Sequence, residues 1–311
     1  VVRVALEAVQ VAFAADHGAI AGGRIAVLGL GRLGSRELTA DSDLDLVIIY
    51  DFDEDNRESS GPRRLDAVVY YTRLTQRLVA TLTAPTRRGR LYEVDLRLRP
   101  QGGKGPLASQ IRGFLAYQTD QADLWEHMAL TRARVIAGDA AFGREVSDAI
   151  ADIIARPRDP GAVAAEVRAM RTLIAQEKGD QDPWDLKLAA GGLTDLDFLA
   201  QALVLSHAHE HRGLIGRSTP DTLAEAAQAG LLDAGDAQKL AEASALLTDV
   251  FQWQRLMIAG RFDPKAVAPA ILKRLATVAG QPDAERLLDR LNETRAGVRE
   301  IFMRLLADSR P

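Results

Sequence analysis

The sequence predicts an α+β protein, in which a small sheet domain at residues 1–110 precedes an all-helical domain at residues 111–311. Strand-like segments lie in the first part: residues 23–30 are a short apolar run between glycines, and residues 42–51 alternate between two faces. After residue 111 the strand patterns fade, and alanine, leucine and arginine recur at helical spacing. These patterns place the sheet first and the helices after it.

The elements of the first part follow from their apolar patterns. We expect a helix over residues 1–18 and a second helix over residues 65–82. In the strand at residues 42–51, Asp43, Asp45, Val47 and Ile49 should face one way, and Leu44, Leu46 and Ile48 the other. Residues 90–100 predict another alternating strand, in which Asp95, Arg97 and Arg99 share a face. In the second part the first expected helices cover residues 111–117, 121–137, 140–155 and 160–178.

Composition narrows the class of protein. Apolar residues make up 47% and charged residues 26% of the 311 residues, as in a soluble globular protein. A net charge of −4 gives no global basic field for nucleic acid, and no apolar run is long enough to span a membrane. The absence of cysteine excludes disulfides and cysteine-bound zinc. We therefore expect a cytoplasmic protein with neither nucleic acid nor membrane as a partner. Because the chain starts without methionine, we also expect a piece of a longer protein.

A glycine motif, Gly29-x-Gly31-x-x-Gly34, has the spacing of a dinucleotide-binding loop. That fold needs a crossover helix of about a dozen residues before the next strand, whereas here about eight residues separate the glycines from it. A Gly-Ser turn that opens a short helix can instead present backbone N–H groups to phosphate oxygens. The sequence favours a phosphate loop over a dinucleotide site.

Three aspartates predict the accompanying metal site. Asp43 and Asp45 stand two positions apart on a strand, so they point the same way and could bridge two Mg²⁺ ions about 4 Å apart. Asp95 is an isolated acid on the next expected strand and could supply a third carboxylate. The alternative is a solvated face of an edge strand, although aspartate is depleted in strands.

The pattern of Gly34-Ser35, Asp43-x-Asp45 and Asp95 resembles the nucleotidyltransferase superfamily of the polymerase-β type, and the expected fold is its small sheet domain. Longer blocks resemble bacterial glutamine synthetase adenylyltransferase over roughly residues 24–210. They are "GLGRLGSRELTADSDLDLVIIYD", "LYEVDLRLRPQGGKGPL", "AYQTDQADLWEHMALTRARVIAGD" and "WDLKLAAGGLTDLDFLAQALVL". Several blocks are closer to the adenylylating half of this bifunctional family than to its adenylyl-removing half.

The resemblance implies a role for each matching residue. The metal ligands and catalytic carboxylates would be Asp43, Asp45 and Asp95. The nucleotide-binding residues would be Gly31, Arg32, Gly34, Ser35, Ser42, Arg97 and Arg99. Arg97 and Arg99 could neutralise the leaving pyrophosphate or equally pair with the carboxylates. Where this chain has Arg32, Ser35, Met128 and Asp197, the family more often has Lys, Gly, Gln and Glu, which leaves any role of Met128 and Asp197 in doubt.

The resemblance also implies the reaction. ATP with two Mg²⁺ ions would donate AMP to a tyrosine hydroxyl of glutamine synthetase and release pyrophosphate, under control of a PII-type regulatory protein in the full-length enzyme. Phosphorolytic removal of AMP from the adenylylated synthetase is the alternative. A binding module without activity would need none of the three aspartates, and an NAD-dependent oxidoreductase is disfavoured by the short loop after the glycines.

Overall fold

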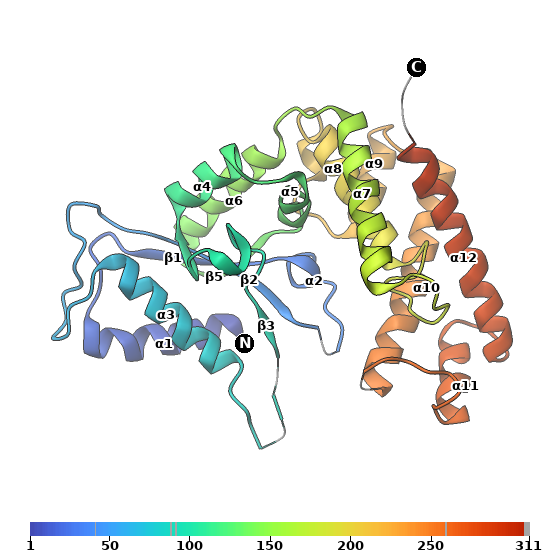
Figure 1. Cartoon of the computed structure of the whole chain (residues 1–311), viewed down its shortest axis with the longest axis horizontal. Coiled ribbons are helices and arrows are strands. Elements are labelled where there is room, and N and C mark those ends of the chain that lie inside the picture. Colours follow the sequence, from blue (N-terminus) through green and yellow to red (C-terminus); the bar gives the residue numbers. More distant parts are fainter. Residues whose placement is uncertain (41, 88, 91, 259, 308–311) are drawn as a thin grey trace. The chain divides into compact units, whose positions relative to one another are not determined.

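The structure is a computed structural model that describes residues 1–40, 42–87, 89–90, 92–258 and 260–307 (Figure 1). It divides into two compact units. Unit 1 comprises residues 1–38 and 42–153, and unit 2 comprises the remaining described residues. Unit 1 holds a sheet with helices and unit 2 is built from helices, so the predicted α+β class is confirmed.

The sheet of unit 1 contains five strands in the described residues. They are β1 (Arg24–Gly29), β2 (Leu44–Asp51), β3 (Val94–Asp95), β4 (Ala108–Gln110) and β5 (Arg134–Gly138). The order is β3-β2-β1-β5, and β4 also pairs with β2. Strand β1 runs antiparallel to β2 and β5, whereas β3 and β4 run parallel to β2. The central strand β2 therefore carries the start of its sequence beside β3 and its end beside β4.

One face of this sheet packs against α1 (Val2–His17) and α3 (Ala67–Leu82). Leu44, Leu46 and Ile48 of β2 belong to that core, as the alternation predicted. Helix α1 contributes residues spaced by three and four positions: Val2, Leu6, Val9 and Phe13. Val4 and Val11 of the same helix lie outside this core and are 63% and 75% exposed.

Two expectations for unit 1 are wrong. The strand predicted over residues 90–100 stops at Asp95, because the Asp95 carboxylate accepts the backbone N–H of Arg97 and the chain turns. The helix predicted over residues 121–137 is instead α5 (Leu124–Leu130) followed by β5, which joins the sheet beside β1. Apolar residues at helical spacing continue into β5, so periodicity alone could not separate the two.

The remaining helices of unit 1 are α2 (Gly31–Gly34), α4 (Ile111–Asp120) and α6 (Ala140–Ile154), with a short η1 (Gly102–Lys104). Because β4, α4 and β5 contact strands β1 and β2, the compact unit extends to Ile153. The sequence predicts its domain boundary earlier, after residue 110. The segment between those two positions completes the sheet unit in this structure.

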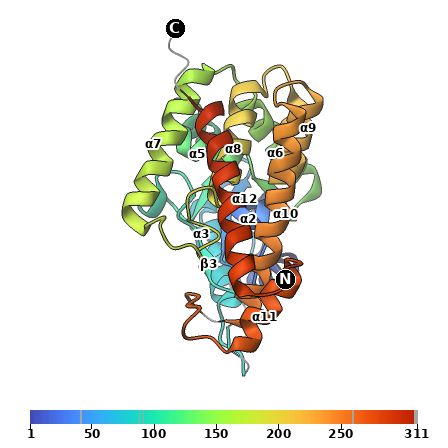
Figure 2. The same cartoon turned by 90° about the vertical axis from the view of Figure 1, so that its right-hand side faces the viewer.

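Unit 2 is helical over its described residues (Figure 2). Its elements are α7 (Pro160–Lys178), α8 (Leu193–His207), η2 (Arg212–Leu214), α9 (Thr219–Gln228), α10 (Ala234–Met257), α11 (Pro269–Val278) and α12 (Ala284–Leu305). Helix α8 is buried at most positions and contacts α7, α9, α10 and α12. Aspartate side chains cap several helices at their first turns, as Asp159 does for α7.

Among the described residues, no helix combines the length and the apolar character needed to cross a membrane.

Candidate active site

Two predicted carboxylates lie side by side at the junction of β2 and β3. The strands are parallel, with Leu44 opposite Val94 and Asp45 opposite Asp95, and the Leu44 N–H donates to the Glu93 carbonyl at 2.9 Å. Residues paired across two strands project from the same face, so Asp45 and Asp95 are neighbours there. Both are half-buried. The sequence predicted only that Asp95 lies on a strand next to that of Asp45, and the structure adds which residues pair.

Asp43 completes the predicted set. It is exposed and stands just before β2, two positions ahead of Asp45, so the alternation of the strand directs it to the same side. The opposite side of β2 is occupied by Leu44 and Leu46 in the apolar core. The three aspartates therefore lie on the face that is turned away from α1 and α3.

Arg97 is bound to one of these carboxylates. Its Nε lies 2.9 Å from Asp95 Oδ2 and its backbone N–H donates to Asp95 Oδ1 at 2.7 Å. The Arg97 guanidinium lowers the pKa of Asp95, although burial acts in the opposite direction. Asp95 in turn raises the pKa of Arg97, with smaller contributions from Asp45 and Asp43. Arg97 is thus a positive group that pairs with one carboxylate of the set, Asp95, in this structure.

The glycine motif forms a tight turn at α2, directly after β1 (Figure 1). After β1, the Leu30 N–H donates to the Asp45 carbonyl at 2.9 Å and α2 forms a single helical turn. Gly31 has a φ of +52°, and a Cβ there would lie 2.4 Å from Asp45 Oδ2. A Cβ at Gly34 would lie 1.8 Å from the Arg132 carbonyl oxygen. Because of these close approaches, a side chain larger than that of glycine does not fit at either position.

The antiparallel pairing of β1 with β2, without a crossover helix, contradicts the dinucleotide interpretation.

Two arginines just before and within β5 hold the turn in place. Arg132 donates from Nη2 to Ser35 Oγ at 2.6 Å and to Glu37 at 2.7 Å, and it is buried. Arg134 donates to the carbonyls of Gly34 and Leu33 at 2.9 and 3.0 Å. Both lie in the "RAR" segment, which the sequence placed on a helix. The error in secondary structure therefore hid how directly these arginines support the glycine turn.

Other predicted nucleotide-binding residues have partners inside the protein. Ser35 is buried and its hydroxyl donates to the Gly31 carbonyl at 3.2 Å. Arg99 is buried, and its three guanidinium nitrogens donate to the carbonyls of Leu96, Gly103 and Gly105. In this structure Arg99 thus braces the loop after β3 through backbone carbonyls and not through a carboxylate.

Arg32 and Ser42 lie closer to the surface of unit 1. Arg32 is half-buried, and its Nη1 lies 3.4 Å from the Glu37 carbonyl oxygen. Ser42 is half-buried and immediately precedes Asp43. Their positions beside the turn and the first aspartate keep both compatible with a nucleotide.

Mg²⁺ prefers hard oxygen ligands, and three carboxylates on one face offer that chemistry. As the described side chains stand, no group of three acidic or histidine residues is gathered closely enough to hold a metal. The two oxygens of Asp95 are both bound by Arg97. The donor set fits a divalent cation by chemistry and by strand register, provided that Arg97 turns away.

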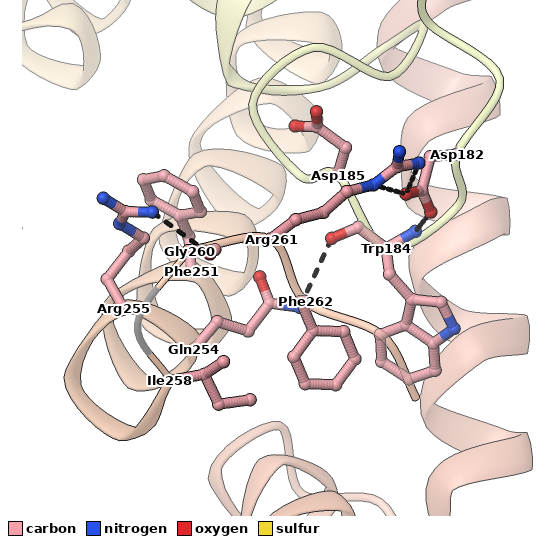
Figure 3. Close-up of a pocket in the computed structure, with 10 residues that line it drawn as sticks. All are labelled: Asp182, Trp184, Asp185, Phe251, Gln254, Arg255, Ile258, Gly260, Arg261 and Phe262. Carbon is pink, nitrogen blue, oxygen red and sulfur yellow. Dashed lines mark hydrogen bonds and ion pairs between the residues drawn. The ribbon is translucent and has the colours of Figure 1, made fainter. Parts of the chain in front are cut away.

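A separate pocket of about 210 Å³ lies within unit 2 (Figure 3). Trp184 and Phe262 form an aromatic wall with ring centroids 5.2 Å apart, and Arg261 closes the rim through an ion pair of 2.7 Å with Asp182. Burial opposes the ionisation of Asp182, but hydrogen bonds from Arg261 and from the Trp184 N–H lower its pKa. The sequence alone indicated no function for these residues.

Two family models match this chain, and each match falls almost entirely within one of the two compact units. Residues 1–149 match the family model of glutamate-ammonia ligase adenylyltransferase. Residues 168–306 match the model of GlnD PII-uridylyltransferase. The first match covers the sheet, the glycine turn and all three aspartates.

Curated relatives match nearly the whole chain. A protein of Bradyrhizobium diazoefficiens named bifunctional glutamine synthetase adenylyltransferase/adenylyl-removing enzyme is 46% identical over 96% of this chain and 30% of its own length. Proteins of the same name from Xanthobacter autotrophicus and Mesorhizobium japonicum are 46% and 45% identical over 98% and 100% of the chain, each over 31% of its own length. The chain thus spans less than a third of these relatives.

Proposed function

Because the chain belongs to the glutamate-ammonia ligase adenylyltransferase family, we propose that it transfers AMP from ATP to a tyrosine hydroxyl of glutamine synthetase and releases pyrophosphate. The observation that supports this most is the pairing of Asp45 with Asp95 beside the turn of Gly31. Carboxylates next to a phosphate-sized turn suit transfer of a nucleotidyl group. The synthetase, as the acceptor, comes from the names of longer relatives and is part of the proposal.

Each residue has a part in this proposal. Asp43, Asp45 and Asp95 would hold Mg²⁺, which would supply charge neutralisation and would lower the pKa of the acceptor hydroxyl. The turn from Gly31 to Ser35 would receive the phosphates of ATP. Arg97 lowers the pKa of Asp95, so the carboxylate stays ionised at neutral pH, which suits it to bind a metal ion better than to accept a proton.

Removal of AMP by phosphorolysis is the second candidate, because the relatives are named for both activities. The segment Tyr92-Glu93-Val94-Asp95, together with "WEH" at residues 125–127, resembles the adenylylating half more closely, and this favours transfer. We further propose that the reaction takes place in the cytoplasm. The match of unit 2 to the GlnD PII-uridylyltransferase model supports a PII-type protein as a regulator of the longer enzyme.

The test is a transfer assay run in both directions. The chain is incubated with unmodified glutamine synthetase, Mg²⁺ and ATP labelled at its α-phosphate. Label on the synthetase supports the proposal. A parallel reaction contains adenylylated synthetase and inorganic phosphate, and release of ADP only there would assign the chain to the removing half. Silence in both reactions would contradict both candidates for this chain.

A further inference from the structure

A cavity of about 360 Å³ lies within unit 1, where the start of α1 meets β2, β5 and the residues around α2. Its wall is mostly apolar. Val2 and Leu44 belong to the buried core, and Leu33, Leu38 and Ile136 pack against that core. The core lies on the side of the sheet that α1 and α3 cover, whereas the three aspartates lie on the opposite face. This cavity is therefore separate from the carboxylate set.

The charged side chains that line this cavity are those of Arg3 and Arg134, and no acid lines it among the described residues. Arg134 is half-buried. Its Nε and Nη2 donate to the carbonyls of Gly34 and Leu33, whereas its Nη1 makes no hydrogen bond to a described residue. Burial lowers the pKa of Arg134, the charge of Arg36 lowers it further, and no acidic residue offsets either effect. An anion in the cavity would therefore compensate a charge that the described residues leave uncompensated.

Tyr92 adds a second polar group to this apolar wall. Its ring packs against the core, and its hydroxyl makes no hydrogen bond to a described residue. A tyrosine can contact apolar groups with its ring and donate a hydrogen bond to a carboxylate with its hydroxyl. Cavities that bind small molecules typically combine apolar walls with a few polar groups that fix the orientation of the ligand. This cavity has both features.

We propose that this cavity binds a small organic carboxylate with an apolar body. The carboxylate accepts a charge-assisted hydrogen bond from Nη1 of Arg134, and the apolar body contacts Val2, Leu44 and Ile136. Such a ligand differs from the nucleotide, because the cavity lies on the face of the sheet opposite the aspartates. The proposal therefore does not depend on the proposed function.

The test uses hexanoate as the probe and measures its affinity for the 311-residue chain by saturation-transfer difference NMR, without nucleotide or synthetase. The wild type should bind hexanoate roughly tenfold or more tightly than hexan-1-ol, which lacks the charge that Arg134 binds. It should also bind hexanoate roughly tenfold or more tightly than acetate, which lacks the apolar body.

Two variants assign the binding to this cavity. Ile136→Phe fills the cavity without removing a hydrogen bond of Arg134, and it should weaken hexanoate binding roughly tenfold or more. Its control is Leu256→Phe, because Leu256 of α10 is 64% exposed. Arg134→Gln should weaken binding on the order of 10- to 100-fold, the loss expected for a charge-assisted hydrogen bond. Arg73→Gln, at an exposed arginine of α3, is the matched charge control.

Thermal unfolding followed by circular dichroism accompanies each variant, because Arg134 also donates to the glycine turn. If Arg134→Gln does not fold, Ile136→Phe and the comparison of ligands on the wild type decide the matter. Loss of hexanoate binding in the folded cavity variants, with wild-type affinity in both controls, would support the proposal.

Three results would overturn the proposal. They are equal affinity of the wild type for hexanoate and hexan-1-ol, wild-type affinity for hexanoate in a folded Ile136→Phe variant, and the absence of hexanoate binding to the wild type. Binding of inorganic phosphate as tight as that of hexanoate would also contradict it, since the apolar wall would then contribute nothing. Each result can be read whether or not the chain transfers AMP to the synthetase.

Discussion

A Cβ at Gly34 would meet the Arg132 carbonyl oxygen at 1.8 Å, so the turn and the segment before β5 leave no room for a side chain. Gly34→Ala should therefore lower the free energy of unfolding by about 1–3 kcal/mol, as overpacking and backbone shifts typically do. Urea denaturation monitored by circular dichroism measures this.

Gly113→Ala is the matched control for this substitution. Gly113 lies in α4 with nothing within 4 Å of an added Cβ, so alanine should stabilise the helix by about 0.5–1 kcal/mol. Opposite signs for the two changes are expected. Equal stabilisation by both would show that the close approach at Gly34 is wrong.

Arg97 and a metal ion compete for the same carboxylate. Arg97→Gln should increase the affinity for Mg²⁺ or Mn²⁺ several-fold, because Asp95 no longer has an internal cation to give up. Titration of Mn²⁺ followed by electron paramagnetic resonance reports this without any turnover. Exposed Arg112→Gln in α4 is the control, and its affinity should match the wild type. A weaker affinity in Arg97→Gln would mean that Arg97 assists the metal.

The lowered pKa of Asp95 also predicts how the free energy of unfolding depends on pH. Arg97 lowers that pKa in the folded protein, so the stabilisation is complete above the unfolded value of about 3.9 and is lost as pH falls through the lower folded value. Wild type should be slightly more stable than Arg97→Gln at pH 7, and the difference should be smaller at pH 3. The effect is small because Arg97 is 82% exposed. Urea unfolding at both pH values measures it, and a difference that grows toward pH 3 would contradict the sign.

At the scale of elements, the sequence predicted strands with a local alternating pattern correctly. It failed for strands whose existence or length depends on contacts that the local pattern does not show. Alternation placed Leu44 and Leu46 in the core and Asp45 on the other face, as β2 confirms. The same alternation overextended β3, because the turn that ends it depends on the Asp95 side chain. Strand β5 was missed because its existence depends on β1, which lies more than a hundred residues earlier.

A buried charge network joins three helices of unit 2. Asp195 of α8 has no exposed surface and accepts hydrogen bonds from Arg171 of α7, from Arg299 of α12 at 3.0 Å and from the Gly191 N–H at 2.8 Å. Loss of the Asp195 charge would leave the positive charges of Arg171, which is buried, and Arg299, which is half-buried, without compensation. The network therefore holds the loop before α8 against both neighbouring helices.

Asp195→Asn should consequently lower the free energy of unfolding by roughly 3–5 kcal/mol. Asp249→Asn is the control, because Asp249 of α10 is exposed and should change stability very little. Chemical denaturation of both variants at pH 7 provides the comparison. A change below about 1 kcal/mol for Asp195→Asn would show that the network is not a stabilising clamp.

At the scale of the molecule, the sequence predicted the order of a sheet part and a helical part, and the structure confirms that class. The limits of the compact units could not be predicted, since β4, α4 and β5 join the sheet through contacts made far along the chain. Asp45 and Asp95 were chosen as candidate site residues because each is an acid on an expected alternating strand, and the structure pairs the two residues in register. The partners of Ser35 and Arg99 needed three-dimensional contacts, which spacing does not report.

The central claim is that the carboxylates of β2 and β3 perform adenylyl transfer, and the most direct measurement compares two aspartate variants. The initial rate of AMP transfer from α-labelled ATP to glutamine synthetase is measured for wild type, Asp45→Asn and Asp148→Asn, an exposed aspartate of α6. We expect Asp45→Asn to lose at least a hundredfold, about 2.7 kcal/mol of transition-state stabilisation, and Asp148→Asn to match the wild type. Asp45→Asn that is folded and transfers AMP at the wild-type rate would contradict the account.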